Sequence, residues 1–131
     1  MKSLIDSPNF GILVFRVFIG LTMAFAHGLG KLPPPQMLID GVQSMGFPLP
    51  IVFAWAAALS EFVGALLIAA GLFTRYAAGF LAFTMGVAAF VVHAQDTFDK
   101  KEMALLYLAA CVLIMFVGAG RFSLDRIIRK K

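Results

Sequence analysis

The 131-residue sequence is 61% hydrophobic and only 14% charged, with a mean hydropathy of +0.92. Soluble domains are about 45–50% apolar and about 25% charged, so this apolar excess exceeds what the core of a soluble domain could hold. The composition therefore predicts one membrane-embedded domain over residues 1–131. The net charge of +4 is concentrated near the C-terminus beside an apolar segment, which favours lipid headgroups over nucleic acid as the anionic partner.

Four apolar segments have about the length that a membrane-spanning helix requires, which is roughly 20 residues. They cover about residues 10–29, 51–72, 76–95 and 103–120. No soluble domain, repeat or low-complexity tract remains between them. The predicted fold is therefore all-α, an integral membrane four-helix bundle with short connections.

The connection between the first two segments, PPPQMLIDGVQSMGFPLP, contains a stretch that is too short to span a membrane. Its prolines at 33–35 end the first helix. Residues 36–46 fit an amphipathic turn or two at the membrane interface. The apolar residues expected on one side of this short interfacial segment are Met37, Leu38, Val42 and Met45.

Positive charges outside the apolar segments predict the orientation, because cytoplasmic loops carry more Lys and Arg. With four spans, one side holds seven such residues and the other side holds three. The seven are Lys2, Arg75, Arg121, Arg126, Arg129, Lys130 and Lys131, and the three are Lys31, Lys100 and Lys101. We therefore expect a multi-pass protein of the inner (plasma) membrane with both termini in the cytoplasm.

Two charged residues lie inside the apolar segments, Arg16 in the first and Glu61 in the second. A charge in hydrocarbon costs about 2.5–3.5 kcal/mol on insertion scales, so it is rarely left unpaired. The opposite signs predict an internal salt bridge between Arg16 and Glu61. Two roles stay open for this pair: a structural one that fixes helix register, and a functional one in a polar pocket that binds a headgroup or relays a proton.

Further polar residues share helix faces with these charges. On the first segment, Met23 and His27 follow Arg16 at helical spacing, and His93 ends a face of small residues on the third. Small residues let helices approach closely, so these faces should converge. We expect His27 and His93 to face each other at the outer end of an intramembrane polar pocket. Its predicted residues are Arg16, Met23, His27, Lys31, Glu61 and His93.

Two roles for His27 and His93 stay open. The histidines can be interfacial residues that are hydrogen-bonded to water or to the backbone. They can also take part in redox-linked proton transfer, because histidine titrates near neutral pH. Nothing at close spacing adds enough ligands for a metal, so none is expected. The single cysteine, Cys111, excludes an internal disulfide or a CxxC pair.

The C-terminal stretch GRFSLDRIIRKK has the pattern of a short basic amphipathic tail. Its apolar residues can enter the headgroup region while Arg and Lys face the lipids. Attachment to anionic lipids and docking of a cytoplasmic partner are both compatible with this pattern. The apolar residues are Phe122, Leu124, Ile127 and Ile128.

The order of several short motifs resembles one known family. They are Arg16 with Gly20, HGLGK at 27–31, Glu61 with Gly64, GLFTR at 71–75, His93, and GAGRFSLD at 118–125. Together they resemble the DoxX family of small four-helix inner-membrane proteins along nearly the whole chain. The resemblance implies that the family's shared polar positions are Arg16, His27, Lys31, Glu61, Arg75 and His93. Some relatives are subunits of a quinone-linked oxidoreductase, and others associate with oxidative-stress enzymes.

Three functions follow as hypotheses. The first is an inner-membrane subunit of an oxidoreductase that binds a quinone-like or lipid ligand in the polar pocket, with Arg75 in a structural loop. The second is a non-enzymatic scaffold or assembly factor for a soluble oxidoreductase or stress enzyme. The third is a carrier of a small solute or lipid. The expected partners are the bilayer, a soluble or membrane oxidoreductase, and further copies of the chain.

Overall fold

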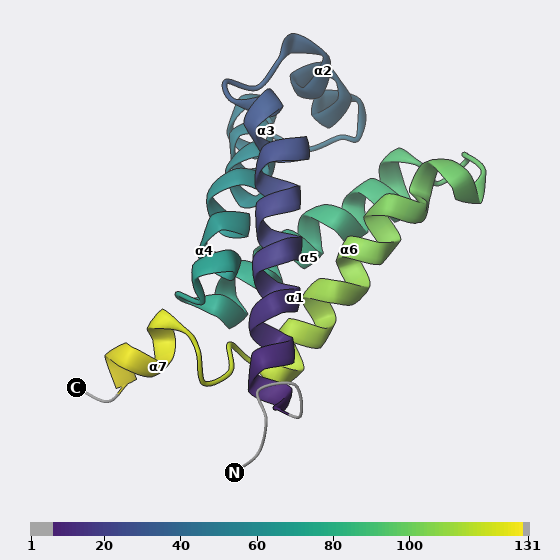
Figure 1. Ribbon diagram of the computed structural model, residues 1–131. Coiled ribbons are helices and arrows are strands. Elements are labelled where there is room, and N and C mark those ends of the chain that lie inside the picture. Colours follow the sequence, from purple (N-terminus) through teal and green to yellow (C-terminus); the bar gives the residue numbers. More distant parts are fainter. Residues whose placement is uncertain (1–6, 130–131) are drawn as a thin grey trace.

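The computed structural model describes residues 7–129, and this part of the chain is helical, with no strands (Figure 1). The all-α prediction is thereby confirmed for the described residues. Lys2, Lys130 and Lys131, which entered the charge count, lie outside them. The elements are α1 (Pro8–Met23), η2 (Ala24–Gly28), η3 (Leu29–Lys31), α2 (Gln36–Ser44), α3 (Pro50–Leu59), η4 (Ser60–Gly64), α4 (Ala65–Ala70), α5 (Thr74–Val87), η5 (Ala88–Val92), α6 (Phe98–Val117) and α7 (Leu124–Arg129).

Three continuous helices in residues 7–129 are long and apolar enough to cross a membrane. They are Pro8–Lys31, Pro50–Ala70 and Thr74–Val92, and they correspond to the first three predicted spans. The fourth predicted span falls on α6, which opens with the charged run Asp99 to Glu102. Its uncharged part, residues 103–117, is about 22 Å long, shorter than a hydrocarbon core of roughly 30 Å. The predicted count of four spans is therefore not confirmed.

Local sequence signals explain where the spanning helices begin and end. Ser7 caps α1 by accepting a hydrogen bond from the Phe10 backbone nitrogen at 3.4 Å, and Pro8 fills the first turn. Pro50 opens α3 in the same way. The helix that ends at Ala70 is closed by Gly71, whose φ of +76° is a left-handed conformation that suits glycine.

Each of the three spanning helices contains one π-helical segment: η2, η4 or η5. A π turn inserts one extra residue, so it rotates the side chains that follow it around the helix axis. Such turns are frequent at functional sites. The segments η2 and η4 contact each other, so the extra residues of two spans lie at the same level.

The first two spans pack through glycines. A Cβ added to Gly20 would lie 2.5 Å from the Ala65 carbonyl oxygen, and one added to Gly28 would lie 2.6 Å from the Glu61 backbone. Helix α5 packs mainly against α6. The predicted contact between faces of small residues is therefore observed between α1–η2 and η4–α4.

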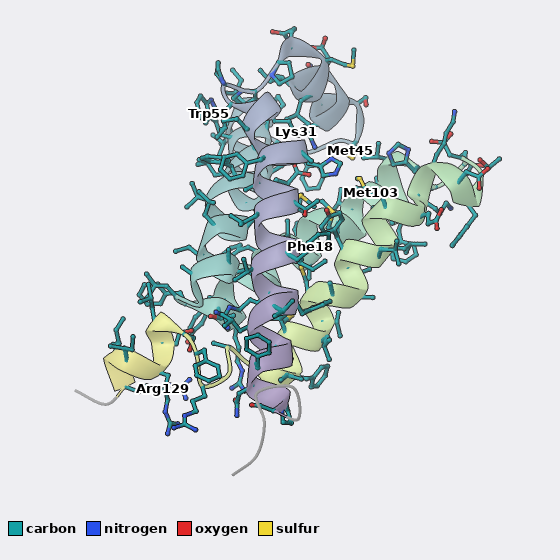
Figure 2. The ribbon with its side chains drawn as sticks, viewed as in Figure 1. Phe18, Lys31, Met45, Trp55, Met103 and Arg129 are labelled. Atoms are coloured by element: carbon teal, nitrogen blue, oxygen red, sulfur yellow. The ribbon has the colours of Figure 1, made fainter. Side chains whose placement is uncertain are left out.

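The helices enclose a small apolar core and expose large apolar side chains. Met23, Leu81 and Ile114 are fully buried. Phe18, Phe80 and many similar residues are exposed along the spans, as expected for surfaces that face lipid. Figure 2 shows Phe18 on α1 among such outward-facing side chains.

Candidate intramembrane binding site

The central feature of the site is an ion pair between Lys31 and Glu61. Glu61 lies in η4 and is 3% exposed. Lys31 ends η3, and its Nζ lies 2.7 Å from Glu61 Oε2 and donates a hydrogen bond to Oε1 at 2.9 Å. Because Gly28 brings the two backbones into contact beside Glu61, the lysine one turn later can reach the carboxylate.

The predicted salt bridge between Arg16 and Glu61 is wrong. The contact between Gly28 and Glu61 sets the register of the two helices. Arg16 precedes Gly28 by twelve residues, which is about 18 Å along a helix and beyond the reach of an arginine side chain. The opposite signs of the two charges suggested a pair, but they do not show this offset, which depends on the register of the two helices.

A cavity of about 370 Å³ lies beside Glu61. It opens between α2, the α3–η4 helix and the α5–η5 helix, and most of its walls are apolar. Three of the six predicted pocket residues line it: Lys31, Glu61 and His93. Figure 2 shows Lys31 and Met45, another lining residue, close together at the α2 end of the molecule.

The other three predicted pocket residues are not among those lining the cavity. Met23 is fully buried in the core. The His27 ring packs edge-on against Tyr107 of α6, with centroids 5.8 Å apart, because the π turn rotates it off the face that carries Gly28. Arg16 lies at the other end of its helix.

Two hydroxyl residues of the cavity wall were not predicted. The Ser60 and Thr84 hydroxyls lie 2.8 Å apart across η4 and α5, and both residues line the cavity. One hydroxyl donates to the other, and the second donates to a backbone carbonyl in its own helix, which is Ala57 for Ser60 and Phe80 for Thr84. The sequence signal that could have identified Ser60 and Thr84 is their polarity within apolar segments. Ser60 also directly precedes Glu61.

His93 stands at the rim of the cavity. Its Nδ1 lies 2.7 Å from Asp96 Oδ2, and about one third of its side chain is exposed. The hydrogen bond from His93 holds the pKa of Asp96 below its usual value, so the acid is ionised at neutral pH. The rim thus carries an imidazole whose orientation is set by a carboxylate.

Helix α2 covers the outer side of the cavity. Leu38, Val42 and Met45 line it, as expected for one side of the predicted amphipathic segment. Met37 was expected with them, but it is 84% exposed. Met37 directly precedes Leu38, and neighbouring residues of an α-helix are about 100° apart around its axis. Met37 therefore faces away from the cavity that Leu38 lines.

Arg16 is used at the opposite end of the molecule. Its guanidinium donates to the carbonyl oxygens of Ala119, of Phe122 at 2.9 Å and of Ala69 at 3.5 Å. The residue is 1% exposed. Arg16 therefore joins α1 to the end of α4 and to the loop after α6.

The DoxX family model matches residues 11–94, which is more than half of the chain. The chain belongs to the DoxX family. It is 33% identical to an uncharacterized protein of Haemophilus influenzae, over 89% of this chain and 92% of that one. It is 31% identical to inner membrane protein YqjF of Escherichia coli, over 100% and 99% of the two chains.

A third relative is from Bacillus subtilis and is named "Putative oxidoreductase CatD". It is 30% identical, over 95% of this chain and 91% of that protein. No solved structure shows a significant match. The apolar helices and the inner-membrane relative together identify this DoxX chain as a membrane protein.

The motifs that carried the DoxX resemblance fall into two groups in space. HGLGK, Glu61 and His93 lie around the cavity end. Arg16, GLFTR and GAGRFSLD meet at the other end, where a Cβ added to Gly71 would lie 2.5 Å from Ser123 and 3.1 Å from the Arg16 guanidinium. This DoxX chain therefore carries two polar centres, one at each end of its helices.

Proposed function

We propose that this DoxX-family membrane protein binds a quinone-like or lipid headgroup in the cavity beside Glu61, as a component of membrane redox chemistry. The observation that carries the proposal is an apolar cavity of about 370 Å³ with an ion pair in its wall whose carboxylate is nearly buried. Ligand pockets are typically apolar with a few polar groups that fix orientation. Intramembrane ionisable residues mark functional sites by default.

The polar groups of the wall fit a carbonyl- or hydroxyl-bearing ring. The Lys31 ammonium has three donors and uses one on Oε1, so it can also donate to a ligand carbonyl. Glu61 Oε2 is close to Lys31, yet it accepts no well-aligned hydrogen bond within residues 7–129. This oxygen is available to a ligand hydroxyl, and the Ser60–Thr84 pair offers a second contact.

An apolar tail has a route out of the cavity. Phe80 and Phe83 line it and are also 70% and 65% exposed on the outer surface of α5. A tail leaving past these rings would enter the surrounding lipid. The proposal thus places the headgroup near Glu61 and the tail beside α5.

Proton exchange is the chemical role that these residues can supply. A bound quinone would supply the redox chemistry, taking up two electrons and two protons on reduction. In this proposal a partner oxidoreductase provides the electrons, and the Lys31–Glu61 pair and His93 exchange the protons. The name of the Bacillus subtilis relative agrees with an oxidoreductase association.

The topology belongs to the same proposal: one domain with four spans, α6 being the fourth, and both termini in the cytoplasm. The excess of Lys and Arg on the side of α7 supports it. Cysteines introduced at Gln43 and Arg126, in a Cys111→Ser background, should react with membrane-impermeant reagents from opposite sides. Reaction from the same side would contradict an even number of spans.

The ligand is tested by native mass spectrometry of the gently extracted protein. We expect a quinone or lipid of defined mass on the wild type, and at least about tenfold less of it on Glu61→Gln. Replacing Ala57 of the cavity wall by Phe fills the space without changing a charge, and should remove the same mass.

Glu102→Gln is the matched control, because it removes one carboxylate from an exposed position of α6 outside the cavity. It should retain the ligand as the wild type does. If Glu61→Gln and Ala57→Phe fold and keep the ligand, the cavity is not its site. If the wild type carries no ligand in any extract, the scaffold hypothesis takes precedence.

A further inference from the structure

A second pocket, of about 730 Å³, lies at the α7 end of the molecule, opposite the end that carries α2 (Figure 1). It is bounded by the starts of α1 and α5, the end of α6, the following loop and α7. Figure 2 shows Arg129 at this end. Nothing in the proposed redox function uses this pocket.

Four arginines line the second pocket: Arg75, Arg121, Arg126 and Arg129. All four are exposed, and within residues 7–129 no carboxylate oxygen lies within 4.0 Å of their guanidinium groups. The acid in the lining is Asp125, which accepts hydrogen bonds from Phe73 and Thr74. None of the four arginines is therefore in a direct ion pair within residues 7–129, and the single charge of Asp125, which Arg129 stabilises from a longer distance, leaves an excess of positive charge in the pocket.

The backbone positions these arginines. A Cβ added to Gly118 would lie 2.9 Å from an Arg75 guanidinium nitrogen, so only a glycine fits there with Arg75 in place. The Arg121 backbone nitrogen donates to Asn9 Oδ1 at 2.9 Å, and the Arg126 backbone nitrogen donates to Ser123 Oγ at 3.3 Å. Gathering four like charges costs electrostatic free energy that a bound anion would offset.

The same pocket has an apolar wall on the lipid side. Tyr76 and Phe73 line it and are 75% and 59% exposed, and Val117 ends the apolar part of α6 beside them. These residues begin one spanning helix and end the apolar run of α6, so they lie at the membrane boundary. A free phosphate would use only the guanidinium groups, whereas a phospholipid would use both walls.

We propose that this pocket binds the phosphate of an anionic phospholipid from the leaflet on the α7 side, with its acyl chains against Tyr76 and Val117. Arginine suits this ligand, because its planar guanidinium can give two parallel hydrogen bonds to one phosphate. The site is a defined pocket and does not depend on the amphipathic tail as a whole.

Fluorescence quenching of the full-length protein in phosphatidylcholine nanodiscs tests this assignment. The probe is Tyr76→Trp in a Trp55→Phe background, and the quencher is phosphatidylglycerol with brominated acyl chains. Brominated phosphatidylcholine at the same mole fractions gives the level of non-specific quenching. We expect phosphatidylglycerol to quench at roughly tenfold lower mole fraction than phosphatidylcholine.

Two double variants that each lose two positive charges distinguish binding in the pocket from general electrostatic attraction of the protein to anionic lipid. Arg121→Gln with Arg126→Gln should weaken the phosphatidylglycerol preference by roughly 10- to 30-fold, from about 1 kcal/mol per basic residue. Lys100→Gln with Lys101→Gln, at the other end of α6, should leave it unchanged. All the substituted side chains are exposed or half-buried at the surface, and helix content and melting temperature verify that each variant is folded.

Three outcomes would overturn the proposal. Equal quenching by both lipids in the wild type would show no anionic site. An unchanged preference in the arginine variant, with the protein folded, would place the site elsewhere. Loss of the preference in 10 mM inorganic phosphate would show that free phosphate displaces the lipid and is the occupant that the pocket prefers.

Discussion

The two ends of the molecule each bury one charged side chain from the first two spans, but they satisfy it in different ways. Glu61 meets a single opposite charge, Lys31, whose side chain is 39% exposed, and a cavity lies beside the pair. Arg16 meets three backbone carbonyls and a close-packed turn. The carboxylate lies beside a cavity that can hold a ligand, whereas the guanidinium donates to three backbone carbonyls and leaves only its Nε without a partner within residues 7–129.

This difference separates two roles that look alike in the sequence. A guanidinium spread over the ends of α4 and α6 ties three segments of the chain together, so its removal should affect stability most. A carboxylate paired with a partly exposed lysine can exchange partners, so its removal should affect binding most. The shared DoxX motifs fall in both groups and therefore do not all mark one site.

The largest effect is expected for Arg16→Ala. The substitution leaves carbonyls of Ala69, Ala119 and Phe122 without their donor, at about 1–3 kcal/mol for each buried group that stays unsatisfied. We expect the free energy of unfolding to fall by about 3–5 kcal/mol, measured by reversible denaturation in mixed detergent micelles. Ligand retention by the protein that remains folded should be unchanged.

Arg126→Ala is the control, because Arg126 is exposed and its side chain makes no recorded hydrogen bond within residues 7–129. Its effect should stay within about 0.5 kcal/mol. If Arg16→Ala unfolds like Arg126→Ala, the guanidinium is not holding the helix ends together, and the comparison of the two ends fails.

The sequence predicted the membrane environment and the helical class, because apolar length is a local signal. It did not predict which charges pair. Pairing depends on helix register, and the register is set by where Gly20 and Gly28 let backbones touch. The spacing of small residues identified these glycines as possible helix contacts, but it did not indicate which residues of the second helix they would touch.

The π turn η2 explains why His27 is not on the expected helix face. A regular helix repeat places His27 on the face of Arg16 and Met23, and the inserted residue of η2 moves Gly28 to that face instead. No composition or spacing rule locates a π turn in advance. His93 does line the cavity, because it ends its helix at the rim, where rotation about the helix axis matters less.

A smaller effect is expected where the two helices touch beside Glu61. In Gly28→Ala the new methyl carbon would lie 2.6 Å from the Glu61 backbone, so the helices must separate. Such overpacking typically costs about 1–3 kcal/mol. The separation should also move Lys31 away from the carboxylate and weaken ligand retention, which native mass spectrometry measures.

Gly30→Ala is a matched control within the same turn of chain, because a Cβ there meets nothing within 4 Å. It reduces the backbone freedom of the unfolded chain in the same way, so the free energy of unfolding should stay unchanged or rise by up to about 1 kcal/mol. Equal destabilisation by both substitutions would mean that loss of glycine flexibility, and not the contact with Glu61, is responsible.

The smallest effect concerns Asp125, which fixes the start of α5 against α7. Its carboxylate accepts from the backbone nitrogens of Phe73 at 2.7 Å and Thr74 at 3.0 Å, and from the Thr74 hydroxyl at 2.7 Å. Phe73 has a left-handed φ of 48°, a strained conformation for a residue with a side chain, and this hydrogen bond holds it there. Burial raises the pKa of Asp125, but the hydrogen bonds outweigh it and leave the pKa below its usual value.

The sign of the pH effect follows from that direction. A depressed pKa in the folded state stabilises the protein above the unfolded pKa of about 3.9, and this contribution is lost as the pH falls through the lower, folded pKa. Asp125→Asn should therefore lower the melting temperature at pH 6, by an amount equivalent to less than about 1 kcal/mol because the group is partly solvated. The gap between wild type and variant should narrow toward pH 3, while the other carboxylates titrate equally in both proteins. A gap that stays constant from pH 6 to pH 3 would mean that Asp125 acts by shape alone, and that the α7 end has no charge-dependent contact comparable to the Lys31–Glu61 pair.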